Sequence, residues 1–176
     1  SVQRECLPPV ILGEDLICQA ESGMGNTSLF VIATLQQLKP IDGEVSMLVI
    51  CPTREISSQI KKEYDRFSKN LDSVNVAAFF GGVPIHKDED AIKNRCPHIV
   101  VGTPARISAL VESGALRLES VKLFILDECD TMITDNYIRK IIEQIAGVMP
   151  EKKQVLICTT SLPKQLRKFC KKLMRN

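Results

Sequence analysis

The chain has 176 residues, of which 44% are hydrophobic and 25% charged, and its formal net charge is +2. This length suits a single domain with a sizeable core, and the composition excludes a disordered chain and a fibrous repeat. No apolar run approaches the roughly 20 residues that span a bilayer, and no basic segment followed by a hydrophobic one opens the chain, so we expect a soluble, unsecreted protein that does not act in a membrane.

Six short apolar runs predict strands, and the segments between them predict helices. The runs are 16–20, 45–51, 74–80, 99–102, 121–127 and 155–160. Between residues 54 and 71 the apolar side chains step by three or four, the spacing of an amphipathic helix; they are Ile56, Ile60, Tyr64, Phe67 and Leu71. Short strands without clean alternation, separated by helices, predict an α/β fold with a mostly parallel sheet covered by helices on both faces.

Polar motifs follow four of these runs. They are the glycine-containing segment 20–28 and the segments 52–55, 102–104 and 127–128. The carboxyl ends of parallel strands meet at one edge of a sheet, where ligands bind in such folds. We therefore expect all four segments to lie on that edge.

The glycine-containing segment has the setting of a phosphate-binding loop. It follows a strand-like run and opens the helix-like run 29–35, the context in which glycines and helix amides cradle phosphates. The pattern Gly-x-x-x-x-Gly-Lys-Ser/Thr requires Lys before Thr27, but the residue there is Asn26, and Glu21 lies nearby. Because a charge-assisted hydrogen bond contributes about 1.5 to 3 kcal/mol, the loss of that Lys alone predicts roughly tenfold to hundredfold weaker nucleotide binding.

Two adjacent carboxylates, Asp127 and Glu128, end the run that begins at residue 121. In P-loop NTPases a carboxylate at a strand end holds Mg²⁺, and the next acidic residue can orient the attacking water. Such a pair often only caps a following helix. Together with the glycine-containing segment, it predicts chemistry on ATP.

The cysteines and the last helix have less specific interpretations. Seven cysteines form no Cys-x-x-Cys pair; Cys18, Cys51 and Cys158 lie in apolar runs and are predicted to be free, buried thiols. Cys96 and His98 lack a second ligand pair, so we discount zinc.

The last helix carries a predicted apolar stripe of Leu166, Phe169, Cys170, Leu173 and Met174. Six basic residues share its segment; a solvated face is favoured for them, and a nucleic-acid contact is the alternative.

Several motifs in order make the chain similar to a known family. They are Gln3 within 1–6, the loop 22–27, Pro52-Thr-Arg-Glu55, Gly81-Gly82, Thr103-Pro-Ala-Arg106, Asp127-Glu-Cys-Asp130 and Thr159-Thr-Ser161. The chain resembles the DEAD-box RNA helicases, and within them the Asp-Glu-Cys-Asp subgroup, the nuclear helicases of mRNA splicing and export. Segments 33–38 and 96–102 also resemble that subgroup. The resemblance covers essentially all of residues 1–176, as the amino-terminal one of two RecA-like domains.

The resemblance implies ATP and Mg²⁺ as cofactors and a role for each matching residue. Gln3 would read the adenine edge, and the nucleotide loop would be Ser22, Gly23, Met24, Gly25, Asn26 and Thr27. Thr27 and Asp127 would hold Mg²⁺, Asp127 through water, and Glu128 would activate the hydrolytic water. The RNA backbone would be contacted by Arg54, Gly82, Thr103 and Arg106. Thr159 and Ser161 would couple the ATP site to RNA and to the second domain.

The resemblance also implies partners and a location. The partners would be single-stranded or duplex RNA bound without sequence preference, a second RecA-like domain, and proteins of mRNA splicing and export. The location would be the nucleus, with the cytoplasm as a second one. We expect residues 1–176 to form one ATP-binding domain that does not unwind RNA alone, because in the family the second domain supplies arginines that complete the site.

Departures from the family pattern leave two functional hypotheses. Asn26 and Glu21 replace lysines, Ala105 replaces a glycine, and Thr159-Thr160-Ser161 replaces Ser-Ala-Thr while keeping the outer hydroxyls. Several departures together favour natural divergence at Asn26 over an engineered change. One hypothesis is the ATP-binding domain of an ATP-dependent RNA helicase with weakened nucleotide binding. The other is a pseudo-ATPase that is retained as an RNA-binding or protein-binding module.

Overall fold

Six parallel strands form one sheet in the computed structural model, which describes residues 2–21, 26–71 and 73–174. The strands are β1 Leu16–Gln19, β2 Met47–Ile50, β3 Val76–Phe79, β4 Ile99–Gly102, β5 Leu123–Leu126 and β6 Gln154–Thr159. Their order across the sheet is β1-β6-β5-β2-β4-β3. Every pairing is parallel, so a crossover must join each strand to the next one in the chain, and helices provide these crossovers.

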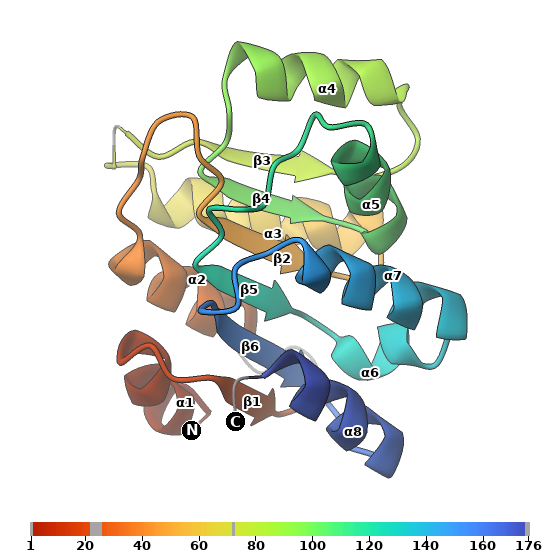
Figure 1. The fold of residues 1–176 in the computed structure, drawn as a ribbon. Coiled ribbons are helices and arrows are strands. Elements are labelled where there is room, and N and C mark those ends of the chain that lie inside the picture. Colours follow the sequence, from red (N-terminus) through yellow and green to blue (C-terminus); the bar gives the residue numbers. More distant parts are fainter. Residues whose placement is uncertain (1, 22–25, 72, 175–176) are drawn as a thin grey trace.

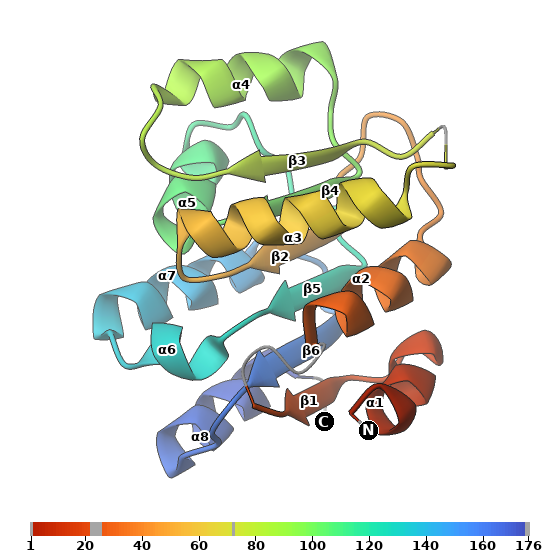
Figure 2. The ribbon, with the colours of Figure 1, turned by 180° about the vertical axis from the view of Figure 1, so that it is seen from behind.

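Helices cover both faces of the sheet, as the sequence predicts. They are α1 Val2–Ile11, α2 Asn26–Gln37, α3 Arg54–Phe67, α4 Ile85–Asn94, α5 Pro104–Glu112, α6 Cys129–Ile133, α7 Asn136–Gly147 and α8 Lys164–Leu173. In Figure 1, α5, α6, α7 and α8 lie in front of the sheet, while Figure 2 shows α1, α2 and α3 on the other face. No helix of the described residues is long and apolar enough to cross a membrane.

The core is divided by the sheet into two layers. Successive residues of β2 alternate between them: Met47 and Val49 join the cluster that includes Phe30 and Tyr64, whereas Leu48 joins the cluster of α5, α7 and α8. All four residues of β2 are buried. Burial on both faces explains why the strands read as continuous apolar runs instead of alternating ones.

Two predicted helices end earlier than their apolar spacing suggests. The C-cap of α3 is Ser68, whose N–H donates to the Tyr64 carbonyl, so Leu71 lies outside the helix and is 45% exposed. Phe67 is 38% exposed and lies beneath the Arg66 guanidinium, which is 4.5 Å from its ring centre. Helix α8 ends at Leu173, one residue before Met174. The spacing alone could not show where the backbone leaves the helix.

The prediction that Cys18 is a free thiol is wrong. Helix α1 lies beside β1 and brings Cys6 to a Cα–Cα distance of 6.6 Å from Cys18, and the two residues form a disulfide. They are separated by 12 residues in sequence, a spacing that carries no pairing signal. Cys51 and Cys158 are free and buried, as predicted.

Candidate functional site

Asp127 follows β5 and carries a buried carboxylate. Its N–H donates to the Ile50 carbonyl at 2.9 Å, which continues the pairing of β5 with β2 and fixes the backbone. Its Oδ1 accepts the Glu128 N–H at 3.0 Å, while Oδ2 has no donor in the described part of the chain. Burial, with a smaller contribution from the Glu128 charge, raises the pKa of Asp127 to about 6. A bound cation would favour the ionised form of this carboxylate.

Glu128 has a strained backbone. Its φ of 52° and ψ of 47° lie in the left-handed region, and no other non-glycine residue of the described chain has a positive φ. Such conformations cost free energy and are found most often where function requires them. Partial burial, followed by the Asp130 charge, raises the pKa of the Glu128 carboxyl. The strain and the adjacent carboxylates mark this turn as a functional candidate.

Asp130, in α6, ties this turn to the end of β6. Its Oδ2 accepts hydrogen bonds from Thr160 Oγ1 at 2.6 Å, Ser161 Oγ at 3.0 Å and the Ser161 N–H at 3.2 Å. Partial burial acts to raise the pKa of Asp130, but these hydrogen bonds outweigh it and leave the pKa below its ordinary value. Thr159 instead donates to the Ser161 carbonyl at 2.7 Å.

The sequence analysis missed Asp130 and Thr160 as members of this network. Ser161 and Thr159 were singled out for their hydroxyls, yet Thr160 makes the shortest of the three bonds to Asp130. A hydroxyl at the middle position, where the related pattern has Ala, was the signal that could have found it. The predicted pair Asp127 and Glu128 therefore belongs to a larger cluster.

The strand before the glycine-containing segment joins the same cluster. The Ala20 N–H donates to the Thr159 carbonyl at 3.0 Å, and Gln19 Nε2 donates to the Thr160 carbonyl at 3.4 Å. The predicted loop residues Ser22, Gly23, Met24 and Gly25 lie outside the described residues, as do the side chains of Gln3 and Asn26. Helix α2 begins at Asn26, Thr27 is half-buried, and Glu21 is exposed.

A separate groove of about 520 Å³ lies at the carboxyl ends of β2, β3 and β4. Its lining residues come from three segments: Pro52, Thr53, Arg54, Gly81, Thr103, Ala105, Arg106 and Ala109. Thr53 caps α3 by accepting the Ile56 N–H at 3.2 Å, so Arg54 is the first residue of that helix. Gly82 has a φ of +107°, and a Cβ there would lie 3.1 Å from Arg54 Nη1. The four predicted backbone-contacting residues thus meet at one place.

Arg106 is held more tightly than Arg54. Its Nη1 pairs with Asp88 of α4 at 2.8 Å, and its Nη2 donates to the Val83 carbonyl at 2.8 Å. Both charged side chains are at most 14% exposed, whereas the Arg54 side chain is 62% exposed and pairs with Glu55 at 3.2 Å. The Thr103 hydroxyl makes no hydrogen bond within the described residues, although Thr103 stands at the N-cap of α5.

The amino ends of α3 and α5 both open on this groove. Arg54 and Pro104 are their first residues, and Pro104 suits that position because it lacks the N–H that would be unpaired there. The partial positive charge of two helix ends, together with two guanidinium groups, favours anionic groups. The groove is therefore chemically suited to phosphates.

The fold and these sites define a RecA-like α/β domain, with an acidic turn and an anion-binding groove on the carboxyl edge of a parallel sheet. The chain belongs to the DEAD/DEAH box helicase family, which residues 1–169 match. It is 50% identical over 175 residues to human ATP-dependent RNA helicase DDX39A, covering 99% of this chain and 41% of that protein. It is 51% identical over 175 residues to rice DEAD-box ATP-dependent RNA helicase 56, covering 99% and 40%.

A solved structure confirms the predicted fold. S. cerevisiae Dbp5, in a complex with Nup159, Gle1, IP6 and ADP, superposes with a TM-score of 0.88 at 22% identity, covering 100% of this chain and 46% of that one. The chain spans about two fifths of the length of the curated relatives that it matches. The predicted family is therefore confirmed.

Proposed function

We propose that residues 1–176 are the ATP-binding domain of an ATP-dependent RNA helicase and form the amino-terminal one of two RecA-like domains. The observation that carries the proposal is the acidic turn: a buried Asp127 beside a strained Glu128, tied through Asp130 to Thr160 and Ser161. This arrangement joins a candidate metal-binding carboxylate to a segment that could respond to RNA or to the second domain. Thr159 and Ser161 would act in that coupling.

ATP and Mg²⁺ are the proposed cofactors. Gln3 would contact the adenine, and residues 22–27 would contact the phosphates. Thr27 and Asp127 offer the oxygen ligands that Mg²⁺ prefers. Burial raises the pKa of Asp127, and bound Mg²⁺ would lower that pKa by stabilising the ionised form. Mg²⁺, when bound, neutralises developing phosphate charge. Glu128, with its own pKa raised, would accept a proton from the attacking water.

RNA is the proposed partner of the groove. Arg54, Gly82, Thr103 and Arg106 would contact phosphates and sugars, which position a strand without reading its sequence. Ala105 adds an exposed methyl group at this surface. We also propose proteins of mRNA splicing and export as partners and the nucleus as the location, with the cytoplasm as a second one, on the strength of the Asp-Glu-Cys-Asp motif.

Nucleotide binding should be weaker than in a relative with the loop lysine. Asn26 lacks the ammonium group that would reach the β and γ phosphates, and the exposed Glu21 adds repulsion. The helix dipole of α2 remains favourable. These residues are the specific observation that favours the second candidate function, a pseudo-ATPase that binds RNA or protein.

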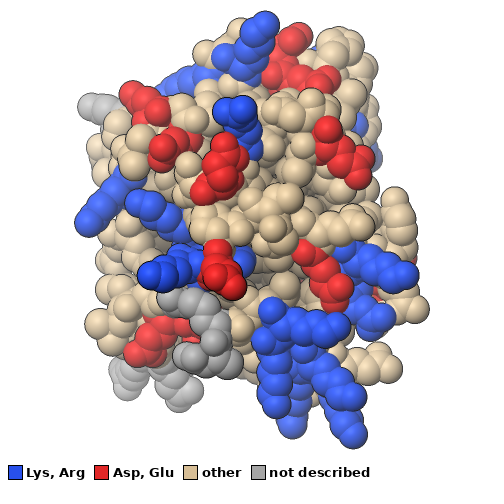
Figure 3. All heavy atoms as spheres, viewed as in Figure 1, with Lys and Arg blue, Asp and Glu red and all other residues tan. Residues whose placement is uncertain are grey.

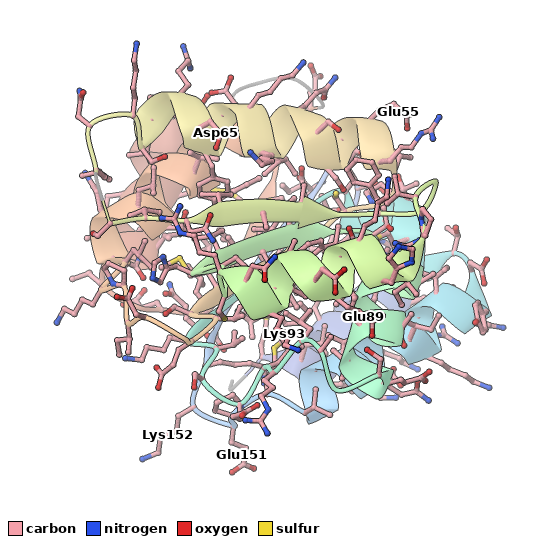
Figure 4. All side chains as sticks on the ribbon, turned by 90° about the horizontal axis from the view of Figure 1, so that it is seen from above. Glu55, Asp65, Glu89, Lys93, Glu151 and Lys152 are labelled. Atoms are coloured by element: carbon pink, nitrogen blue, oxygen red, sulfur yellow. A yellow bond between two sulfur atoms is a disulfide. The ribbon has the colours of Figure 1, made fainter. Side chains whose placement is uncertain are left out.

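The two carboxylates of the acidic turn can be tested by titrating a fluorescent ATP analogue with and without Mg²⁺. Asp127→Asn should remove most of the Mg²⁺-dependent increase in affinity, because it removes the charge that holds the metal. Glu128→Gln should leave affinity nearly unchanged, since a water-activating base acts mainly in the transition state. Glu151→Gln is the matched control: this exposed carboxylate precedes β6, at the amino edge of the sheet and thus at the opposite edge from Asp127, and it projects from the surface in Figure 4.

Equal losses of affinity in Asp127→Asn and Glu128→Gln would contradict the separate roles. If the wild-type chain binds no nucleotide at any Mg²⁺ concentration yet still binds RNA, the binding-module function replaces the enzymatic one.

A further inference from the structure

Helix α8 separates its residues into an apolar face and a basic face. Leu166, Phe169, Cys170 and Leu173 are buried against the core. The opposite face carries five exposed cations: Lys164, Arg167, Lys168, Lys171 and Lys172. Figure 3 shows them as a continuous basic patch at the lower right, over α8. We call these five residues the basic face.

Little on the molecule neutralises this charge. Lys172 lies 3.9 Å from Glu143 of α7, an exposed and weak pair, whereas the other four cations have no carboxylate within ion-pair distance in the described part of the chain. The first turn of α8 contains no acidic residue. The whole chain has 23 basic and 21 acidic residues, so the basic face accounts for more than the net charge of +2.

This arrangement serves the stability of the helix only in its last turn, where Lys171 and Lys172 lie at the negative end of the helix dipole. Lys164 and Lys168, like Arg167 and Lys171, stand four residues apart on one face, where like charges repel. Lys164 also lies at the positive end of the helix dipole. Neutral polar residues would leave the buried face unchanged and remove the repulsion. A bound polyanion would attract each of these cations and would offset the repulsion between them.

The basic face lies near the groove. Helix α8 begins at Lys164, soon after the Ser161 that binds Asp130, and therefore starts at the carboxyl edge where the groove opens. Strand β6 is two strands from β2, three from β4 and four from β3, which is about 10 to 20 Å at the usual spacing of ~4.8 Å. Both α5 and α8 lie on the same face of the sheet (Figure 1).

We propose that the basic face of α8 is a second RNA-binding surface, which contacts phosphates of a strand that continues beyond the groove of Arg54 and Arg106. This inference rests on the proposed RNA binding of that groove. The contacts are electrostatic and independent of sequence. RNA is favoured over an acidic protein segment because the patch shares an edge and a face with a groove already suited to phosphates.

Strands of two lengths test the proposal on the 176-residue chain. The α8 variant combines Lys164→Gln, Lys168→Gln and Lys171→Gln, and leaves Lys172 with Glu143. The control variant combines Lys62→Gln, Lys69→Gln and Lys152→Gln, which removes equal charge from exposed positions on other elements; Lys152 projects away from the molecule in Figure 4. Binding is measured against salt for a strand of about five nucleotides and for one several times longer.

The α8 variant should bind the longer strand about tenfold more weakly at low salt, with a salt slope reduced by about 2, since each phosphate contact on a single strand contributes ~0.7. Affinity for the short strand should change no more than in the control variant. The melting temperature of the α8 variant should stay close to that of the wild type, because removal of the repulsion offsets the loss of Lys171 from the negative end of the helix. This result excludes unfolding as the cause.

Equal losses in the α8 and control variants would overturn the proposal, as would a loss that is the same for both strand lengths. If polyglutamate binds the wild type as tightly as RNA does and only its binding depends on α8, the surface is one for acidic protein segments. The contribution of the groove to RNA binding is measured separately, as the affinity of the Arg54→Ala variant for the short strand. If that change leaves short-strand binding intact, the proposed groove is wrong, and a length-dependent loss in the α8 variant would then show RNA binding by α8 that does not continue from that groove.

Discussion

Thr160 shows how one side chain can alter a site whose principal residues are elsewhere. Its hydroxyl gives the Asp130 carboxylate a third donor beside the two from Ser161. The related pattern has Ala at this position, so the extra bond is a feature of this chain. We infer that Thr160 stiffens the connection between α6 and the end of β6.

The change Thr160→Ala should lower the free energy of unfolding at neutral pH by about 0.5–1.5 kcal/mol. The pKa of Asp130 is below its ordinary value in the folded chain, so its hydrogen bonds stabilise the fold above the unfolded-state pKa of about 3.9, and this contribution is lost as the pH falls through the folded-state pKa. The cost of the change should therefore shrink in acid. Urea unfolding at several pH values measures it.

Thr134→Ala is the matched control for that experiment. Thr134 is also exposed, but its hydroxyl donates to the neutral Thr131 carbonyl at 3.0 Å. Its cost should not depend on pH. A cost of Thr160→Ala that stays constant from neutral pH into acid would contradict the role assigned to Asp130.

Asp127 affects the pH dependence of stability in the opposite direction from Asp130, because its pKa is raised instead of lowered. Its pKa is raised to about 6 by burial, so the folded chain binds this proton more tightly than the unfolded chain does, and stability is lost as the pH rises from about 4 to 6. Asp127→Asn should raise the free energy of unfolding by about 1–3 kcal/mol at pH near 7.5 and change it little near pH 4, in the absence of Mg²⁺. Calorimetry at the two pH values checks this, and equal effects at both would contradict it.

At the scale of elements, the groove is held by contacts of unequal strength. Arg106 joins α5 to α4 through the largely buried Asp88, whereas Arg54 pairs only with its exposed neighbour Glu55. Arg106→Ala should therefore cost about 1–3 kcal/mol of stability by leaving Asp88 without its partner, and Arg54→Ala less than about 0.5 kcal/mol. Both should weaken binding of unrelated RNA strands to similar extents.

Chemical denaturation and RNA titration on the same two variants separate these effects. RNA affinity that is unchanged in both variants would place the RNA surface elsewhere. Equal stability of the two variants would show that the Asp88 pair contributes nothing measurable.

The elements and their order could be predicted well from the sequence, because buried parallel strands are apolar on both faces and remain distinct from amphipathic helices. All six predicted strands are present within one or two residues at each end. The motifs at 52–55, 102–104 and 127–128 lie at the carboxyl edge because chain direction requires it. Asp127 and Glu128 were expected at that edge for the same reason, and they follow β5 there.

What the sequence did not show depends on contacts between segments far apart in the chain. Neither the pairing of Asp88 with Arg106 nor that of Thr160 with Asp130 follows from local spacing, since the partners are 18 and 30 residues apart. The Cys6–Cys18 disulfide depends on how α1 packs beside β1. The end of α3 at Phe67 depends on a backbone cap instead of on apolar period.

At the scale of the whole molecule, one edge of the sheet brings together an acidic turn, an anion-binding groove and the start of a basic helix. The chain spans about two fifths of its curated relatives. We propose that a second RecA-like domain closes over this edge. The strength of nucleotide binding then decides whether the edge works as an enzyme or as a binding module.

The affinity ratio of ATP to AMP in the variant Asn26→Lys tests this account most directly. Asn26 is the first residue of α2, and a lysine there should add a charge-assisted contact to the β and γ phosphates that AMP lacks. ATP should bind about tenfold more tightly than to the wild type, with little change for AMP. Glu21→Lys, as a control for long-range charge, should help less and lose its effect at high salt. An unchanged ratio in Asn26→Lys would mean that the segment does not bind phosphates, and the ATP-binding function proposed here would be contradicted.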